Sequence, residues 1–314
     1  MTKPVVVVGS LNLDLVVRPE KAPVAGETVF APELARYPGG KGGNQAVAAA
    51  RLGVPVAMVA RVGQDAFGDE LLESLRQNGV SVDAVSRSDT AGTGTAVITV
   101  DRTGQNRIVV VAGANSEVTP QLVQHHRDVI RSASVLLLQL EVPVESCVEA
   151  ARIAAEAGVP VILDPAPAPE KPLPVELCRA TWLVTPNETE AERLTGVAVR
   201  GAEGAAAAAR ALLAQGFERA VVKLGGEGAY LLARGEDEGL WIEPFRVPVV
   251  DTTAAGDAFA GGLAAALARG LALPEALRWA SAAGALAVTR PGAQPAMGTL
   301  AELTALLEDK GVGA

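Results

Sequence analysis

Short runs of branched apolar residues alternate with helical stretches along most of this chain. The runs lack the regular apolar–polar alternation of a half-buried strand, so they predict strands of a parallel sheet covered on both faces. The stretches between them end in Gly, which is typical of a helix C-terminus. Such strand–helix alternation indicates βαβ units in an α/β fold. The predicted strands are 5–9, 56–60, 135–140, 159–164, 181–186 and 220–225, and the predicted helices are 43–53, 67–79, 144–158 and 204–216.

Two segments break the alternation. Residues 13–20 with 26–38 predict short antiparallel strands, and 94–114 predicts a hairpin with its turn at Asp101 to Gly104. We expect these insertions, at about 13–38 and 94–114, to form a small β-sheet that projects from the main body as a lid. No linker is long enough to separate two domains. The sequence therefore predicts a single domain over 1–314, with a three-layer α/β/α, Rossmann-like architecture around a mostly parallel central sheet.

Composition narrows the range of partners. The 314 residues are 49% hydrophobic, which suits one large α/β unit with a filled core. A net charge of −9 without a basic run argues against nucleic acid. The longest apolar runs are far shorter than the roughly 20 residues that a membrane-spanning helix needs. The apolar run at the N-terminus ends in Gly-Ser and predicts a strand rather than a signal peptide.

The cysteines and histidines are few. Cys147 and Cys178 are the only cysteines, and they are not in a CxxC spacing. Two isolated thiols without an export signal favour a reducing cytoplasm over a structural disulfide. His125 and His126 are adjacent and cannot share one helix face as metal ligands do, so they predict no zinc site. We therefore expect a cytoplasmic protein with no membrane or nucleic-acid partner.

The stretch DTTAAGDAFAGGLAAAL, residues 251–267, places one carboxylate, Asp257, between Ala-Ala-Gly and a long apolar run. Asp257 follows a predicted strand at 247–250 and opens a helix, so it should lie beyond the carboxyl ends of the strands, where ligands bind. Two interpretations are open. In one, Asp257 caps its helix, as Asp often does in a first turn. In the other, it is a catalytic base beside free backbone N–H groups that bind a phosphate, and the small residues allow close approach.

The motif GGKGGNQ, residues 39–45, also has two interpretations. It is not a Walker loop, yet glycines before a helix let a polar ligand approach closely, and Asn44 and Gln45 would offer it donors and acceptors. Alternatively it is a tight loop followed by an ordinary helix cap.

Three further motifs lie at predicted strand ends. In TPNETEAE, Asn187 and Glu190 either meet the positive end of a helix dipole or hold waters of a Mg²⁺ ion. The turn KLGGEGAY, residues 223–230, either only joins two strands or also contacts a nucleotide phosphate. Glu141 lies just past a buried strand, the favoured place for a substrate-facing carboxylate in an open sheet.

The order of these motifs is more specific than any one of them. GSLNLD, GGKGGNQA, QLE, LDPAPAP, TPNETEAE, KLGGEGAY, DTTAAGDAF and VTRPGAQPA follow one another along the chain. Together they resemble the ribokinase family of carbohydrate kinases, and the resemblance covers essentially the whole chain. It implies ATP, Mg²⁺ and K⁺ as cofactors.

The resemblance assigns a role to each motif. Asp257 would be the general base that takes the proton from a sugar hydroxyl as it attacks the γ-phosphate of ATP, and Ala254, Ala255 and Gly256 would form the anion hole. Glu190 would organise Mg²⁺. The sugar would contact Asn12, Asp14, Gly40, Lys41, Gly42, Gly43, Asn44, Glu141 and Asp257. ATP would contact Asn187, Lys223, Leu224, Gly225, Gly226, Glu227, Gly228, Gly256 and Ser281.

At two positions the chain departs from the family. Relatives often place a larger side chain against the adenine where this chain has Ser281, which cannot stack. A related enzyme uses a serine hydroxyl as a potassium ligand where this chain has Ala296, so potassium dependence should be weaker. The potassium ligands implied are the Asp251 carboxylate, the backbone carbonyls of Thr253, Ala287, Arg290 and Gly292, and an oxygen near Ala296.

The resemblance implies an ATP-dependent kinase that converts D-ribose to D-ribose 5-phosphate by phosphorylation at O5, releasing ADP. Fructose, 2-keto-3-deoxygluconate, deoxyribose and pseudouridine are alternative substrates. A non-catalytic sugar or nucleotide sensor is an alternative from another class, although a sensor has no use for the base Asp257. Exposed lid edges with apolar residues such as Val16, Val17, Val97 and Ile98 predict a homodimer formed through the lid.

Overall fold

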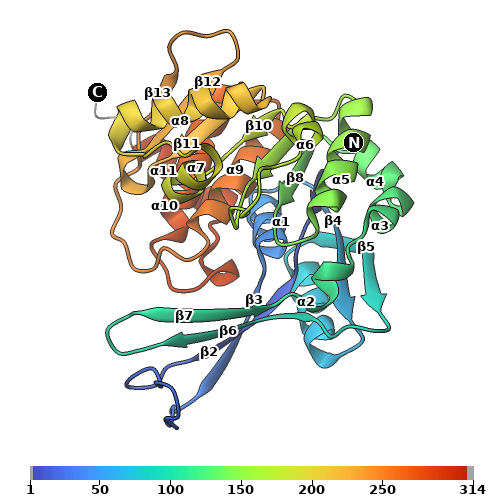
Figure 1. Ribbon diagram of the computed structural model, residues 1–314, viewed down its shortest axis with the longest axis vertical. Helices are drawn as coiled ribbons and strands as arrows, with labels where there is room; N and C mark the ends of the chain where they lie inside the picture. Colours follow the sequence, from blue (N-terminus) through green and yellow to red (C-terminus); the bar gives the residue numbers. More distant parts are fainter. Residues whose placement is uncertain (1–2, 310–314) are drawn as a thin grey trace.

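A large sheet forms the centre of the protein. The computed structural model describes residues 3–309, so both ends of the expected 1–314 unit lie outside the described residues. Within them, nine strands pair in the order β13-β12-β11-β10-β9-β8-β1-β4-β5 (Figure 1). All neighbouring pairs are parallel except β11–β12 and β12–β13, which are antiparallel. Their bounds are β1 Val5–Val8, β4 Val56–Gly63, β5 Val80–Ser88, β8 Val135–Gln139, β9 Val161–Asp164, β10 Leu183–Val184, β11 Arg219–Lys223, β12 Ala229–Ala233 and β13 Leu240–Ile242.

Helices cover both faces of this sheet, as predicted. Val5 and Val7 of β1 pack in one apolar cluster with α1, α2, α9 and α10, while Val6 and Val8 pack in a second cluster with α5 and α8. Because both faces are buried, the strands show no apolar–polar alternation. The helices are α1 Lys41–Arg51, α2 Ala66–Gln77, α3 Pro120–His125, α4 Arg127–Arg131, α5 Val144–Glu156, α6 Val175–Ala180, α7 Glu188–Thr195, α8 Gly201–Gln215, α9 Ala255–Ala268, α10 Leu273–Ala287 and α11 Leu300–Asp309, with 3₁₀ turns η1 Gly113–Glu117, η2 Gly225–Glu227 and η3 Gln294–Ala296.

A second, smaller sheet projects from the main body, at the bottom of Figure 1. Its strands are β2 Asn12–Val17, β3 Leu34–Gly39, β6 Gly94–Val100 and β7 Asn106–Val111, in the order β3-β2-β6-β7. The pairs β2–β3 and β6–β7 are antiparallel as predicted, but the central pair β2–β6 is parallel. The reason is that β2 follows β1 and β6 follows β5, and these two strands point the same way in the main sheet.

Several details differ from the sequence prediction. Residues 247–250 form no strand, and Val249 and Val250 are exposed. Of residues 26–38 only those from Leu34 onward are in a strand. Strand β5 was not predicted.

The exposed apolar residues of the small sheet also differ from the expected ones. Val16 is buried because β2 is a central strand, and Val17 and Ile98 are half-buried. Only Val97 of the four expected residues is exposed, whereas all six residues of the edge strand β7 are exposed. Apart from Leu34 on the other edge strand, β3, the exposed large apolar residues of this sheet lie on β7 and its neighbour β6.

Small residues let α1 and α9 approach each other closely. A Cβ on Gly261 of α9 would lie 2.5 Å from the Ala48 Cβ and 2.7 Å from the Gln45 carbonyl oxygen of α1. At the start of α1, a Cβ on Gly42 would lie 2.7 Å from the Ser10 backbone nitrogen. This close packing brings the N-terminal turns of both helices to the carboxyl edge of the sheet.

Two further sequence expectations can be compared with the fold. Cys147 and Cys178 are both buried and free, so no disulfide joins them. Over residues 3–309, no helix combines the length and apolar character needed to cross a membrane.

Candidate active site

The carboxyl ends of neighbouring strands bring the predicted motifs together. Ser10 follows β1 and Glu141 follows β8, while Asp164 ends β9 and Lys223 ends β11. These strands are adjacent in the sheet, with β10 between β9 and β11. The first turn of α9, with Asp257, lies at the same edge. The placement expected for ligand-binding residues in an open parallel sheet is thus observed.

Asp257 is the buried centre of this cluster. Its side chain is 4% exposed and lies in the first turn of α9. The Asn44 Nδ2 donates a hydrogen bond to its Oδ2 at 2.9 Å, and the Gln45 Nε2 donates to its Oδ1 at 3.1 Å. Both donors come from α1, so the carboxylate is held by a neighbouring helix rather than by N–H groups of its own. A helix cap alone therefore does not account for Asp257.

The surroundings of Asp257 make it a stronger base than an ordinary aspartate. Burial and the nearby Asp164 raise its pKa, whereas Lys41 and the hydrogen bonds from Asn44 and Gln45 lower it, and together they bring the pKa to about 6. At neutral pH the carboxylate is mostly deprotonated, yet it is basic enough to accept a proton from a bound hydroxyl.

The turn before Asp257 is strained. Ala254 has a φ of 58°, the only positive φ of a non-glycine residue among residues 3–309. A left-handed alanine costs about 1–2 kcal/mol, and such strain concentrates at functional sites. The Ala255 N–H contacts the Thr252 carbonyl at 3.3 Å, while the described part of the chain supplies no acceptor for the N–H groups of Ala254 and Gly256. Two backbone donors are thus available at the N-terminus of α9.

The Gly-rich loop is anchored by Glu141. The Glu141 Oε2 accepts hydrogen bonds from the Ser10 hydroxyl at 2.5 Å and from the Lys41 backbone N–H at 3.0 Å. Gly40, the N-cap of α1, has a φ of 80°, which favours glycine. Glu141 therefore fixes the loop that leads into Asn44, in addition to facing the site.

Asp14 and Lys41 complete the predicted sugar side. Burial raises the pKa of Asp14, the charges of Glu141 and Asp257 also raise it, and the resulting pKa is about 7, so these carboxylates lie near one another. Burial opposes the charge of the Lys41 ammonium, but Asp257, Asp164, Glu141 and Glu190 outweigh it and raise the pKa of Lys41. The positive charge of Lys41 therefore partly offsets the negative charge of the carboxylates at the centre of the site.

The predicted nucleotide side begins with a capping box. The Asn187 Oδ1 accepts from the Glu190 N–H, and the Glu190 Oε2 accepts from the Asn187 N–H, both at 2.9 Å. The helix-cap interpretation of this pair is therefore correct. Burial and Asp164 raise the pKa of Glu190, which Lys223 and Lys41 oppose. Glu190 thus faces the same cluster of charges as Asp257.

The remaining residues expected at the nucleotide are less buried. Gly225, Gly226 and Glu227 form the exposed turn η2, and Ser281 on α10 is half-buried. The Leu224 N–H donates to the Gly228 carbonyl at 2.8 Å, which closes the turn. This leaves an open surface beside Lys223.

Sequence reasoning missed Asp164, Gln139 and part of the role of Gln45. The Gln45 Nε2 donates to Asp164 at 3.0 Å as well as to Asp257, and the Gln45 Oε1 accepts from the Gln139 Nε2 at 2.7 Å. Asp164 also pairs with Lys223 at 3.0 Å. Asp164 is the last residue of a predicted strand, so the rule that located Glu141 would also have located it.

Most residues expected to bind potassium lie on two loops joined by Asp251, while Ala287 ends α10 and Ala296 ends η3. The Asp251 Oδ1 accepts from the backbone N–H of Thr253 and the Oδ2 accepts from that of Gly292, both at 2.9 Å. Burial opposes these bonds, which nevertheless lower the pKa of Asp251. Ala296 is buried and offers no side-chain oxygen, and the Arg290 side chain pairs with Glu302. The donors available here are one carboxylate and backbone carbonyls, which suit a hard cation.

Comparisons with known proteins agree with this arrangement. Residues 2–300 match the family described as pfkB family carbohydrate kinase. The solved structure of Arabidopsis thaliana ribokinase complexed with ribose and ATP is similar to this chain with a TM-score of 0.93 and 38% identity, covering 98% of this chain and 99% of that one.

Two curated relatives differ in length. A ribokinase from Haemophilus influenzae is 39% identical over 308 residues, covering 98% of this chain and 99% of the relative. A bifunctional ribokinase/ribose-5-phosphate isomerase A from Fructilactobacillus sanfranciscensis is 40% identical over 299 residues, which cover 95% of this chain and 55% of that protein. This chain therefore spans about half the length of the bifunctional relative.

The ion pair of Lys223 with Asp164 gives a stability prediction. Replacing Lys223 by Met leaves a carboxylate that is 3% exposed without its cation, which should lower the free energy of unfolding by about 3 kcal/mol. The double variant Asp164→Asn with Lys223→Met should recover most of this loss. Urea denaturation measures both.

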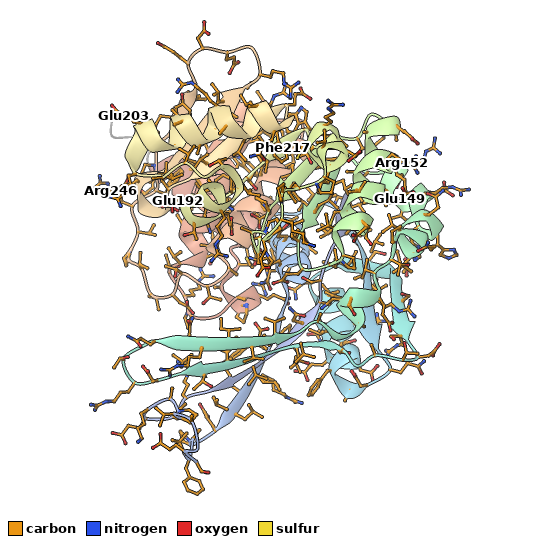
Figure 2. The ribbon with its side chains drawn as sticks, in the orientation of Figure 1. Glu149, Arg152, Glu192, Glu203, Phe217 and Arg246 are labelled. Carbon is orange, nitrogen blue, oxygen red and sulfur yellow. The ribbon has the colours of Figure 1, made fainter. Side chains whose placement is uncertain are left out.

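Arg152 supplies the matched control. It pairs with Glu149 and Glu156 on the outer face of α5, where Figure 2 labels Arg152 and Glu149. Arg152→Met should leave the free energy of unfolding nearly unchanged, because water screens an exposed pair. If Lys223→Met and Arg152→Met lowered the free energy of unfolding equally, this would contradict the claim that the Lys223–Asp164 pair stabilises the fold because it is buried.

Proposed function

Because the chain belongs to the pfkB family of carbohydrate kinases, we propose that this ATP-dependent carbohydrate kinase phosphorylates D-ribose at O5, giving D-ribose 5-phosphate and ADP. The observation that carries the proposal is the buried Asp257 carboxylate at the N-terminus of α9, held by Asn44 and Gln45. Ribose is favoured by the similarity to a ribokinase that binds ribose and ATP.

The chemistry follows from this placement. Asp257 takes the proton of the sugar hydroxyl while the hydroxyl oxygen attacks the γ-phosphorus of ATP. The bond from that phosphorus to the β,γ-bridging oxygen breaks, and ADP leaves. The free N–H groups of Ala254 and Gly256 stabilise the charge that develops on the transferred group. Ala255 contributes a third donor when its weak contact with Thr252 opens.

Sugar recognition uses residues of both sheets. Asn12 and Asp14 of β2 supply polar groups from the small sheet, and the loop Gly40 to Gly43 supplies backbone groups and the Lys41 charge. Asn44 contacts the sugar next to Asp257. The Asn44 Oδ1 is buried without a hydrogen-bond partner among residues 3–309, so it has an acceptor to offer. Glu141 holds the loop in place.

ATP lies along the open nucleotide side. We assign its contacts to Asn187, to the turn from Lys223 through Leu224, Gly225, Gly226 and Glu227 to Gly228, and to Ser281. The small Ser281 contacts the base without stacking. Mg²⁺ fits beside Glu190, since only one oxygen of Glu190 bonds to Asn187 and the other can hold a water of the ion. Bound there, Mg²⁺ would neutralise phosphate charge.

Potassium fits the loops joined by Asp251. The Asp251 carboxylate and the carbonyls of Thr253, Ala287, Arg290, Gly292 and Ala296 would hold it. A cation at this place would brace the turn that begins α9.

Two broader properties complete the proposal. The free thiols Cys147 and Cys178 support the reducing cytoplasm as the compartment in which the protein acts. The exposed apolar residues of β6 and β7 support a homodimer in which two small sheets pair, because isolated apolar edges of this kind are usually covered.

Asp257→Asn tests the catalytic assignment. The variant should lose about 10²–10⁴-fold in kcat with ribose, because the amide cannot accept the proton. ADP release measures this across a panel of ribose, fructose, 2-keto-3-deoxygluconate, deoxyribose and pseudouridine, with circular dichroism as the control for folding. Preference for another sugar would replace ribose in the proposal. If the wild type releases no ADP with any compound of the panel, a non-catalytic sensor would be favoured.

The raised pKa values of Asp257 and Asp14 set the pH profile. The base works when deprotonated, and the sugar ligand Asp14 has a pKa of about 7, so kcat/KM for ribose should decline below about pH 7 and fall by about a further factor of ten per unit below about pH 6. The residual activity of Asp257→Asn should lack the acid limb near pH 6 and keep the one near pH 7. A limb near pH 6 in both proteins would assign it to another group, such as ATP.

Potassium dependence tests the cation loops. Activity should rise when potassium replaces tetramethylammonium as the only monovalent cation at constant Mg²⁺. Ala296→Ser adds a hydroxyl oxygen near the loops and should lower the potassium concentration for half-maximal activity. Identical activity with and without potassium would contradict this site.

Light scattering tests the dimer. The wild type at micromolar concentration should have twice the chain mass of 32.0 kDa. Val109→Lys on β7 should yield monomers, because a charge would be buried between the sheets. Val249→Lys is the matched control, since both valines are 65% exposed and Val249 lies outside the small sheet. A monomeric wild type would overturn the proposed dimer.

A further inference from the structure

Asn115 on η1 is a buried polar residue outside the machinery assigned above. It is 1% exposed and lies beside the start of β2. Its Oδ1 accepts from the Leu11 N–H at 2.9 Å, and its Nδ2 donates to the Leu11 carbonyl at 3.1 Å. One backbone donor and one backbone acceptor of the same residue thus fix which end of the Asn115 amide is oxygen and which is nitrogen.

The second hydrogen on the Asn115 Nδ2 needs another acceptor. The Asn12 Oδ1 accepts it at 2.7 Å. Because a donor faces this oxygen, the orientation of the Asn12 amide is fixed as well. The structure gives the Asn12 Nδ2 no acceptor within residues 3–309, so this nitrogen keeps its hydrogens for a ligand. Asn12 can offer the sugar a donor, whereas its neighbour Asp14 offers an acceptor.

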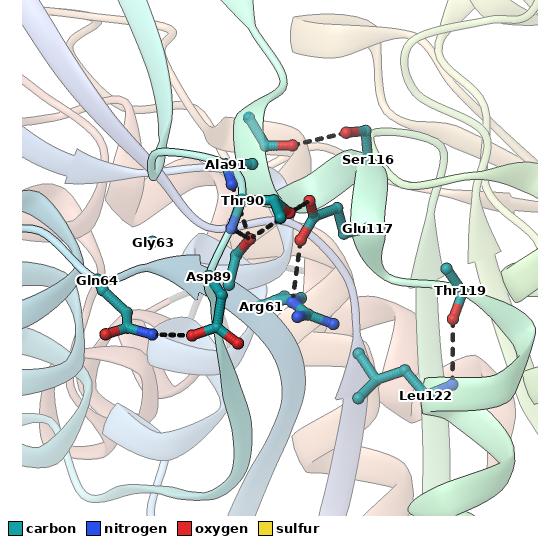
Figure 3. Close-up of polar contacts among 12 residues, drawn as sticks. Arg61, Gly63, Gln64, Asp89, Thr90, Ala91, Ser116, Glu117, Thr119 and Leu122 are labelled. Carbon is teal, nitrogen blue, oxygen red and sulfur yellow. Dashed lines mark hydrogen bonds and ion pairs between the residues drawn. The ribbon is translucent and has the colours of Figure 1, made fainter.

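The surrounding structure holds Asn115 in place. A Cβ on Gly94 would overlap both the Asn115 Nδ2 and the Asn12 Oδ1, so glycine is needed for the two amides to meet. The Ala114 N–H donates to the Gly92 carbonyl at 2.8 Å. Glu117, at the other end of η1, accepts from the Thr90 hydroxyl at 2.6 Å and pairs with Arg61 at 3.2 Å, as Figure 3 shows. The turn is therefore anchored to β4 and to the segment between β5 and β6.

From these contacts we infer that Asn115 is a positioning residue that orients the Asn12 amide so that it donates to the sugar. The inference rests on the proposed function, because it assigns Asn12 to sugar binding. The Leu11 backbone orients the Asn115 amide, and Asn115 orients the Asn12 amide. Asn12 then selects an acceptor on the ligand, such as the oxygen of a hydroxyl whose own hydrogen is donated to Asp14.

Asn115→Asp tests this chain of contacts. An aspartate at 115 still accepts from the Leu11 N–H but cannot donate to the Asn12 Oδ1. The Asn12 amide then turns to donate to residue 115 and presents its oxygen to the sugar. KM for ribose should rise about tenfold, as expected for one mismatched hydrogen bond. We expect kcat to change less than about twofold and KM for ATP to stay constant, a split that general damage to the fold would not produce.

A double-mutant cycle with Asn12→Ala decides whether Asn115 acts through Asn12. In the Asn12→Ala background, Asn115→Asp should raise KM for ribose by less than about twofold. Ser116→Ala is the matched control and should leave KM unchanged, because among the described residues the Ser116 hydroxyl bonds only to the Gly113 carbonyl on the same turn. If Asn115→Asp does not fold, Asn115→Ser enters the same cycle, since its hydroxyl has one hydrogen and cannot donate to both the Leu11 carbonyl and the Asn12 Oδ1.

Each outcome bears on a definite claim. An equal rise in KM in both backgrounds, or no rise in the wild-type background, would overturn the role of Asn115 while leaving the kinase proposal intact. A wild type that turns over no sugar would overturn the proposed function, and the inference with it.

Discussion

The structure depends most on the contact between α1 and α9 at Asp257. A carboxylate that is 4% exposed needs partners, and Asn44 and Gln45 supply them across 213 and 212 residues of sequence. The helices can meet only because Gly261 faces Ala48 and Gln45 without a side chain. The Ala-rich and Gly-rich composition of both helices therefore has a positional reason. A larger residue at 261 would separate the base from the side chains that orient it.

Much of this could be predicted from the sequence, because strand ends in a parallel sheet share one edge. Glu141, Asn187 and Lys223 were located by that rule, whereas Asp257 lies at the expected edge although the strand predicted before it, at 247–250, does not form. The local sequence pattern cannot predict which distant segments of the chain pair with each other. The parallel pairing of β2 with β6, the irregular path of 247–250 and the buried contacts of Asn115 depend on which segments meet in space.

For two of the motifs, the structural role that is observed is compatible with the proposed binding role. Asn187 and Glu190 form a capping box, yet one Glu190 oxygen remains free of that box and the side chain lies among the charges of the site. Glu141 anchors the Gly-rich loop while sharing the electrostatic environment of Asp14. A helix N-terminus at a sheet edge needs a cap for stability and provides free N–H groups for a ligand, so the same residues satisfy both requirements.

The charge balance of the site bears on how a nucleotide could enter. Five carboxylates, Asp14, Glu141, Asp164, Glu190 and Asp257, lie close enough to Lys41, Lys223 or one another to shift pKa values. The excess of negative charge contributes to the raised pKa values of Asp14, Glu190 and Asp257, after burial itself. A polyphosphate would meet the same repulsion, since two lysines do not offset five acids. Added cations would relieve the crowded carboxylates and attract the phosphates together, which gives a physical reason for a kinase of this construction to bind its nucleotide as a metal complex.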